Sequence, residues 1–188
     1  MLESAESEVR HGPTAHWHPH ASHKGVLGVP HLPASERQQG AQQLTRAEVE
    51  RRITGTWELL EWHVDGQVLK PPVVNGRALF RDGQVLAIFH RDNDGTRYEW
   101  TGYGSYSLDQ SRWTYGYSHT LEVTQKAKDN TVVEGTREQT PFAFRVEGST
   151  LVLDDQKGDR SFVFESDEFV YFQQGRPLRR WRRLKPSA

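Results

Sequence analysis

The chain has 188 residues, a formal net charge of −1 and no cysteine, and 35% of its residues are hydrophobic and 11% aromatic. This length suggests one domain with a tail, and the lack of cysteine excludes disulfides, thiolate metal sites and a cysteine nucleophile. No apolar run approaches the roughly 20 residues that cross a bilayer, and the acidic start (Glu3, Glu6 and Glu8) is unlike a signal peptide. We therefore expect a cytoplasmic protein without a membrane partner.

Residues 1–44 form a leader that we expect to be flexible, because they offer too little apolar surface to offset the entropy lost on ordering. Residues 16–20 alternate histidines around Trp17, and His23 follows, so this segment can chelate Zn²⁺, Ni²⁺ or Cu²⁺. No cysteine or acidic residue completes the cluster, and a metal-free polar tail is the alternative. A third interpretation is a lid, in which Trp17 and residues 26–32 fold over a barrel mouth.

A short helix is predicted at the start of the folded part. Thr45 and Glu48 fit a capping box, in which each side chain accepts a hydrogen bond from the other residue's backbone N–H. Residues 47–52 then supply about two helical turns. We place the domain boundary near residue 44, with one folded domain at 45–188.

From Thr56 onward, short strands alternate with turns and no helical period intervenes. Asp82-Gly83 is a direct hairpin signal, and similar turn signals recur along the chain. Turns spaced by about 8–12 residues are typical of an all-β fold. The short connections favour an antiparallel up-and-down β-barrel of about eight to ten strands, because closure leaves no exposed sheet edge. Eleven strand-like runs supply the strands of this barrel, at residues 57–64, 77–80, 85–89, 98–108, 113–124, 131–136, 142–146, 151–153, 161–165, 169–172 and 181–184.

Two motifs mark the ends of this strand series. Gly55-Thr56-Trp57 opens the first strand, and Trp181-Arg182-Arg183 closes the last. If these strands pair, a tryptophan can plug one end of the barrel while a guanidinium covers the face of its ring. Such a stacked contact contributes roughly 0.5–2 kcal/mol once it is desolvated.

Several short motifs follow in order between residues 53 and 185: Gly55-Thr56-Trp57, Gly76-Arg77-Ala78-Leu79-Phe80, Asp82-Gly83, Gly104-Ser105-Tyr106, His119, Gly148-Ser149-Thr150-Leu151-Val152-Leu153 and Trp181-Arg182-Arg183. Together they resemble the bacterial lipocalin-like domain family of the calycin superfamily. The resemblance implies a lipocalin-like barrel with Trp57 and Arg183 stacked at its closed end. Gly-Thr-Trp also resembles fatty-acid-binding proteins of that superfamily. The glycine-rich continuation of haem-binding nitrobindin-like barrels is missing, so we expect no haem and no other cofactor.

The predicted strand at residues 113–124 has one large aromatic face and one small polar face. Side chains alternate along a strand, so the aromatic face is expected to point inward. On the neighbouring strand, Gly102 and Gly104 are expected to leave room between aromatic residues. A barrel of about eight strands can hold one small ligand, and an aromatic core with tyrosine hydroxyls at the rim is the alternative. The candidate ligand-binding residues are Trp100, Tyr106, Trp113, Tyr115, Tyr117, His119 and Arg137.

Three residues are candidates for catalysis. If Trp57 points inward, alternation places Glu61 and His63 on the same face unless a bulge intervenes. A carboxylate beside an imidazole perturbs the pKa of both and forms a proton-transfer pair. Glu61, His63 and His119 are therefore the catalytic candidates, and a position at the water-filled rim is the alternative. We expect no metal site among the barrel residues.

The first functional hypothesis is a binding module that takes up one small apolar or amphipathic molecule. The second is a cofactor-free cyclase or isomerase of a natural-product pathway, because similar barrels include such enzymes; its aromatic cavity would shape the substrate and the leader would exclude water. The third is metal handling by the histidine-rich leader. The arginines of residues 176–185 suggest a nucleic-acid patch, but the net charge near zero argues against it. A monomer and a homodimer are both compatible with the sequence.

Overall fold

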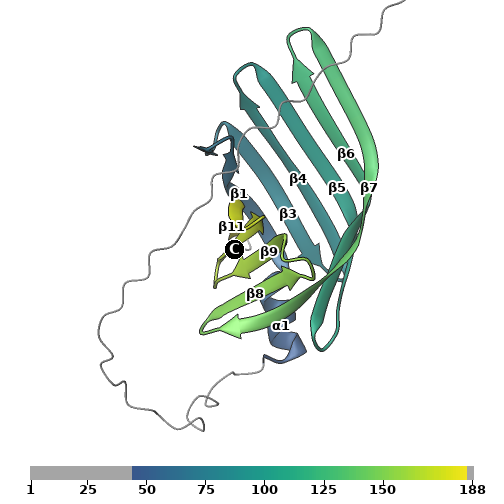
Figure 1. Cartoon of the computed structure of the whole chain (residues 1–188), viewed down its shortest axis with the longest axis vertical. Coiled ribbons are helices and arrows are strands. Elements are labelled where there is room, and N and C mark those ends of the chain that lie inside the picture. Colours follow the sequence, from purple (N-terminus) through teal and green to yellow (C-terminus); the bar gives the residue numbers. More distant parts are fainter. Residues whose placement is uncertain (1–43, 186–188) are drawn as a thin grey trace, which may run out of the picture. The chain divides into compact units, whose positions relative to one another are not determined.

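The computed structural model describes residues 44–185. In this part of the chain, eleven strands form one antiparallel sheet, and pairing of the last strand with the first closes it. The ring itself contains ten strands, because the short second strand lies outside it. The prediction of an all-β up-and-down barrel is confirmed (Figure 1).

The strands follow one another around the barrel in chain order, apart from β2, which pairs only with the far end of β1. The longest strands lie in one broad wall of the barrel, which includes β4 to β7 (Figure 1). The bounds are β1 (Gly55–Val64), β2 (Gln67–Leu69), β3 (Val74–Arg81), β4 (Gln84–Asn93), β5 (Thr96–Leu108), β6 (Arg112–Lys126), β7 (Asp129–Glu147), β8 (Thr150–Asp155), β9 (Arg160–Phe164), β10 (Glu168–Gln173) and β11 (Arg176–Arg183).

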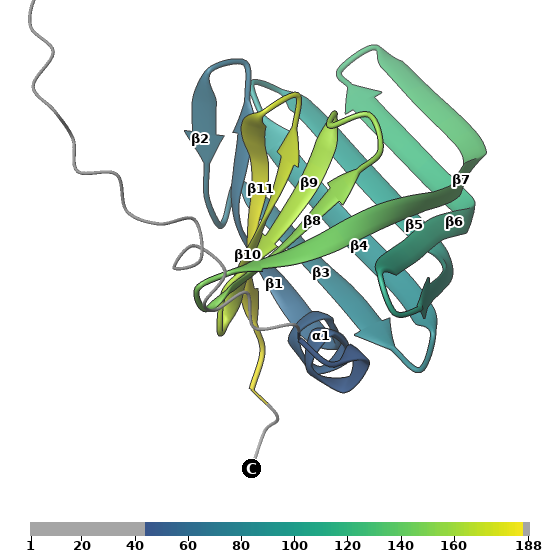
Figure 2. The same ribbon diagram turned by 60° about the horizontal axis from the view of Figure 1, so that its bottom comes forward.

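The predicted capping box and helix are confirmed. Helix α1 (Arg46–Ile53) begins after Thr45, whose Oγ1 accepts a hydrogen bond from the Glu48 backbone N–H at 3.3 Å. The Glu48 carboxylate accepts one from the Thr45 backbone N–H at 2.8 Å. Val49 and Ile53 are buried, so the apolar side of this short helix packs against the barrel. The helix lies at the end of the barrel where β1 begins (Figure 2).

The predicted stack of Trp57 and Arg183 closes that end. The two residues are paired across β1 and β11, and the Arg183 guanidinium carbon lies 4.1 Å from the centre of the Trp57 ring. Arg183 also donates hydrogen bonds to the carbonyl oxygens of Arg52, at 2.7 Å, and Thr54. It therefore ties together the helix end, the first strand and the last strand.

The half of the barrel next to this closed end is packed with aromatic rings. Trp113 is fully buried, and its ring centre lies 5.6 Å from that of Phe80, 5.7 Å from Phe142 and 5.3 Å from Phe162. Edge-to-face and tilted contacts of this kind add to the free energy gained by burying apolar area. Space for a ligand therefore has to lie toward the opposite end, where β4, β6, β8 and β10 finish.

The strand alternation is interrupted by bulges in β1, β6 and β7. The register of β1 against β11 shifts between Leu59 and Glu61. That of β5 against β6 shifts between Tyr103 and Gly104, and that of β6 against β7 shifts on both sides of Tyr117. A bulge adds one residue to a strand and so reverses which side chains point inward beyond it.

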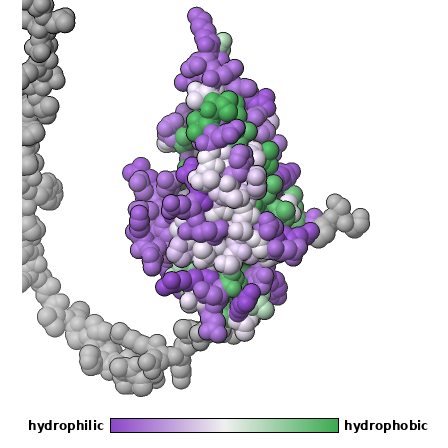
Figure 3. Space-filling model, turned by 90° about the vertical axis from the view of Figure 1, so that its right-hand side faces the viewer, coloured by the Kyte–Doolittle hydropathy of each residue, from purple (hydrophilic) through white to green (hydrophobic). Residues whose placement is uncertain are grey.

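The outer surface is mostly polar, with separate hydrophobic patches on the face drawn in Figure 3. Exposed large hydrophobic side chains on the barrel include Leu86 and Ile88 of β4, Tyr103 of β5, and Val132 and Val133 of β7. In residues 44–185, no helix combines the length and apolar character that crossing a membrane requires. The predictions about the leader, namely its flexibility, the histidine-rich metal site and the lid, lie outside the described residues.

Candidate functional site

A cavity of about 460 Å³ occupies the open half of the barrel. Its floor is formed by Ala78 of β3 and Ala87 of β4, which are paired neighbours on these adjacent strands. Residues of the β8–β9 and β10–β11 turns, among them Asp159 and Gln174, line its mouth. Its wall carries the aromatic side chains Phe89, Tyr98, Trp100, Tyr115, Tyr117, Phe162, Tyr171 and Trp181. Aromatic side chains therefore line the deep part of the cavity, and polar side chains line its rim.

The rings of Trp100 and Tyr117 lie close to the β5 backbone. Trp100 stacks on Phe89 with ring centres 5.0 Å apart, and Tyr117 meets Trp100 edge-on, also at 5.0 Å. A Cβ atom on Gly102 would lie 2.8 Å from Tyr117 Cδ1 and would also clash with the Trp100 ring. On Gly104 it would collide with the backbone of the neighbouring strand. The expectation that these glycines leave empty room is therefore corrected, because rings and backbone occupy the space beside them.

Arg179 of β11 brings a cation into this aromatic cavity. Its guanidinium carbon lies 4.1 Å from the ring centre of Phe89 and 4.6 Å from that of Trp62. Its Nε atom is shielded from solvent and has no hydrogen-bond partner in the described residues. Within residues 44–185, no carboxylate lies within 4 Å to form an ion pair with it. Burial lowers the pKa of Arg179 to about 10, against the opposing effect of nearby phenols, so the group is charged at neutral pH.

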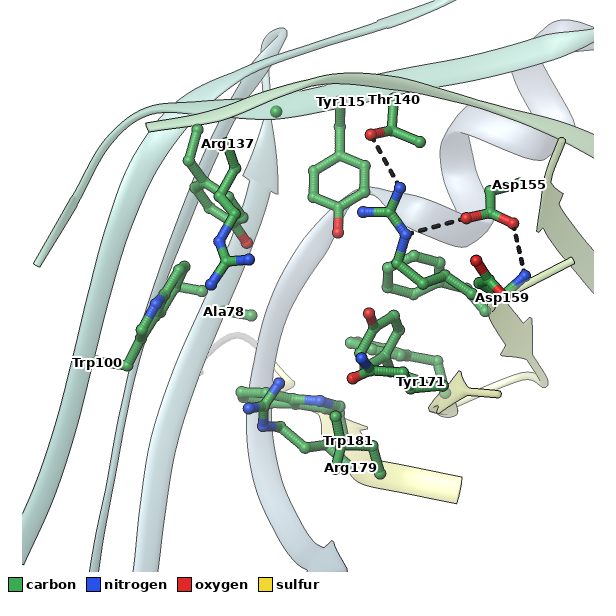
Figure 4. Close-up of a pocket in the computed structure, with 18 of the residues that line it drawn as sticks. Ala78, Trp100, Tyr115, Arg137, Thr140, Asp155, Asp159, Tyr171, Arg179 and Trp181 are labelled. Atoms are coloured by element: carbon green, nitrogen blue, oxygen red, sulfur yellow. Dashed lines mark hydrogen bonds and ion pairs between the residues drawn. The ribbon is translucent and has the colours of Figure 1, made fainter. Parts of the chain in front are cut away.

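Arg160 of β9 provides a contrast within the same cavity. Its Nε lies 3.0 Å from Asp155 Oδ2, and one of its terminal nitrogens donates to Thr140 Oγ1 at 3.2 Å (Figure 4). The Asp155 side chain is 3% exposed and also accepts a hydrogen bond from the Asp159 backbone N–H at 2.9 Å. Burial opposes the Asp155 charge, but Arg160 and these N–H groups hold the pKa of its carboxyl below the usual value. Arg160 is thus neutralised within the protein, whereas Arg179 is not.

Four tyrosines surround these arginines and retain their protons. Burial is the main cause of a raised pKa in each of them, and it brings that of Tyr98 to about 12. The neighbouring Glu122 carboxylate raises the pKa of Tyr98 further. Nearby guanidinium groups, which favour phenolate, only partly offset burial at Tyr117 and Tyr171. At neutral pH the four groups are therefore hydrogen-bond donors rather than anions.

These shifts predict a delayed tyrosine titration. In the unfolded chain the pKa of a phenol is about 10, and folding raises it here. The contribution of such a phenol to the free energy of unfolding is fully present below about pH 10 and is lost as the pH rises through the pKa of the folded state. We expect Tyr98, Tyr115, Tyr117 and Tyr171, four of the six tyrosines, to ionise at a higher pH than in the unfolded chain, Tyr98 only near pH 12. Absorbance at 295 nm measures this, with the denaturant-unfolded chain as control. Six phenols titrating together near pH 10, with the circular dichroism still native, would contradict it.

The structure places the predicted ligand-binding residues in three positions. Trp100, Tyr115 and Tyr117 line the cavity, and Arg137 lies at its exposed rim on β7. Tyr106 and Trp113 are buried in the packed half of the barrel and are absent from the cavity lining. His119 lies on the outer face. Contact of any of these residues with a ligand stays a prediction.

His119 lies outside because β6 bulges between Tyr117 and His119. Its ring lies 5.4 Å from that of Tyr103, which is 54% exposed on the outer surface. The next residue, Thr120, is buried and takes the inward position instead. The aromatic face of residues 113–124, which we expected to point inward along its whole length, points inward only as far as Tyr117. The expected inward placement of His119 is therefore wrong.

Glu61 and His63 also face away from the cavity. The β1 bulge turns Trp62 inward, where it is 5% exposed. Glu61 lies opposite the exposed Arg180, and its carboxylate is 3.3 Å from both His63 Nε2 and Lys70 Nζ. Partial burial opposes its charge, but the Lys70 ammonium and the hydrogen bond with His63 keep the pKa of Glu61 below the usual value. The expected carboxylate–imidazole pair thus forms, but outside the barrel, and His119 does not join it.

Sequence reasoning missed Arg179, the most unusual charge in the cavity. It is one of the arginines of residues 176–185, which the sequence suggests only as a nucleic-acid patch. The pattern of β11 contained the signal, because an inward Arg183 places Trp181 and Arg179 inward by alternation, with Arg180 and Arg182 outside. The inward position of Arg179 thus follows from the predicted stack at the closed end.

Comparison of the chain with protein-family models, curated proteins and solved structures finds no match. The barrel is compatible with a lipocalin-like fold. Across the part of the chain that the structure covers, no group of three histidine, aspartate or glutamate side chains is arranged to hold a metal ion.

Proposed function

We propose that this protein binds one small amphipathic molecule inside its barrel. The observation that carries the proposal is the cavity of about 460 Å³ with its aromatic wall. Small-molecule sites commonly span about 300–1,000 Å³ and combine apolar walls with a few placed polar groups. Rigid rings such as Trp100 and Phe89 offer apolar contact area and lose little conformational freedom when a ligand packs against them.

The polar part of the proposed ligand would lie toward the mouth. Arg137, Lys157 and Gln173 are at the rim, whereas Ala78, Ala87 and the aromatic rings are deeper in the barrel. A molecule with an apolar body and a polar end therefore matches this gradient better than a wholly apolar one.

The enzyme hypothesis has less support from the geometry. Its proton-transfer candidates were Glu61, His63 and His119, which lie on the outer face of the barrel. The metal hypothesis concerns the leader, outside the described residues. Uptake of a small molecule is the function that the arrangement of side chains supports best.

The proposal predicts saturable binding of an uncharged apolar fluorophore, N-phenyl-1-naphthylamine, to the full-length protein. We expect one site per chain, with energy transfer from the cavity tryptophans Trp100 and Trp181 to the bound probe. Ala87→Leu places a larger side chain on the cavity floor and is expected to weaken binding about tenfold or more, because overpacking costs about 1–3 kcal/mol.

Ile88→Ser is the matched control, because Ile88 follows Ala87 on β4 and its side chain is 48% exposed on the outer face. It should leave binding unchanged. If Ala87→Leu folds normally and binds as the wild type does, or if only Ile88→Ser weakens binding, the probe occupies the outer surface. Either result would overturn the proposal.

A further inference from the structure

We propose that the cavity contains an anion-binding subsite centred on Arg179, and that the polar end of its ligand is a carboxylate. This inference rests on the proposed function, since it names the chemistry of the molecule that the barrel takes up. It starts from the positive charge of Arg179, which no acidic side chain among the described residues neutralises.

The contacts of Arg179 are aromatic. Phe89 and Trp62 lie under its guanidinium at 4.1 and 4.6 Å, which gives cation–π attraction but no hydrogen bond. A guanidinium carries five N–H donors in a planar fork, and buried donors without acceptors are costly. A ligand carboxylate supplies two acceptor oxygens in the geometry that such a fork binds best.

The acidic residues that line the cavity are Glu138, Asp155 and Asp159, and within residues 44–185 none of them forms an ion pair with Arg179. Asp155 is held by Arg160 and by backbone N–H groups on its own turn. Glu122 of β6 lies near the Tyr98 phenol. Asp155 and Glu122 thus each have another partner close by, and the Arg179 charge remains available to a ligand.

The other polar groups facing the hollow also favour an anion. Arg137, Tyr115 and Arg179 point their polar ends toward a common space, with Tyr171 on the adjoining wall (Figure 4). The protonated phenols donate hydrogen bonds, and the two guanidinium groups add positive charge. A neutral hydroxyl group in the same space would accept hydrogen bonds from these donors, but it would not gain the attraction between opposite charges.

Displacement of N-phenyl-1-naphthylamine by decanoate and by decanol tests the subsite with two ligands that differ only in their polar end. In the wild type, decanoate should displace the probe at a concentration about tenfold or more below that of decanol, because a hydrogen bond to a charged group contributes about 1.5–3 kcal/mol. Arg179→Met should abolish this preference while keeping affinity for the neutral probe. Arg179→Lys should retain part of it, because it keeps the charge but loses the planar fork.

Arg180→Met is the matched control, since the exposed Arg180 guanidinium pairs with Glu168 on the outer face. It should keep the wild-type preference for decanoate. An unchanged preference in Arg179→Met, or a wild type that treats the two ligands alike while it binds the probe, overturns the subsite and leaves the proposed function standing. Failure of the wild type to bind the neutral probe at all contradicts the proposed function and overturns the subsite with it.

Discussion

Replacing Arg183 with methionine is expected to lower the free energy of unfolding by about 2–4 kcal/mol. The substitution removes the guanidinium that lies 4.1 Å above the Trp57 ring and the hydrogen bonds to the carbonyls of Arg52 and Thr54. Those carbonyls end helix α1, and in the variant they lose a charged donor. Methionine retains part of the apolar contact with the indole, so the effect isolates the charge and the hydrogen bonds.

Arg182→Met is the control for this prediction. Arg182 is the preceding residue on β11, it is exposed, and its guanidinium pairs with Glu58 at 2.8 Å on the outer face. A surface ion pair contributes only about 0–1 kcal/mol. Urea denaturation of the two variants at pH 7 measures the difference. Equal losses of stability in both would show that the Trp57–Arg183 stack does not hold the closed end together.

Replacing Arg179 with methionine is expected to have the opposite sign and to raise the free energy of unfolding by about 1–3 kcal/mol. Burial lowers the pKa of Arg179 to about 10, which means that folding disfavours its charged form. For a base with a lowered pKa, this cost is present below the folded value and disappears as the pH rises above it. Methionine removes the cost and keeps apolar contact with Phe89 and Trp62, although it loses the cation–π attraction.

The measurement requires protein stripped of bound ligand, because an anion on Arg179 stabilises the wild type by mass action and hides the difference. Unfolding at pH 7 should then rank Arg179→Met above the wild type and Arg183→Met below it. A ligand-free Arg179→Met variant that is less stable than the wild type would show that the guanidinium already has a stabilising partner in the fold.

The two arginines therefore separate the closed end of the barrel from the end where we propose that the ligand binds. Both point inward from β11, with Trp181 between them. Arg183 has an aromatic face and carbonyl acceptors, so the fold satisfies its N–H donors, although burial lowers its pKa. Arg179 has aromatic faces and no acceptor among the described residues, so its charge is available for binding.

Local signals were sufficient for the helix and several of the turns. Thr45 and Glu48 form the expected capping box, because its hydrogen bonds join residues three positions apart. Asp82 and Gly83 adopt φ angles of 51° and 76°, the left-handed region that a tight hairpin turn demands. Both features depend on neighbouring residues alone, so they are readable without knowledge of the rest of the chain.

The inward and outward faces of the strands were predictable only as far as the first bulge. Trp57 and Leu59 are inside as alternation predicts, and then Trp62 takes the inward place expected for Glu61 and His63. The same reversal puts Thr120 inside and His119 outside. Whether a strand bulges depends on its pairing partners, Arg180 and Trp181 for β1, which lie more than a hundred residues away in the chain.

The sequence by itself determined the all-β class, the helix cap, the order of the strands and the closing pair of Trp57 and Arg183. These features follow from short-range hydrogen bonding, from alternation and from two motifs at the ends of the series. Only the tertiary structure decided which polar groups share the interior. Arg179 became a half-buried cation without an acidic partner among residues 44–185, because closure of the barrel brings β11 against β1 and places its side chain on Trp62 and Phe89. Alternation along β11 is enough to place Arg179 inward, but whether its charge is compensated depends on contacts between distant strands, and no local pattern carries that information.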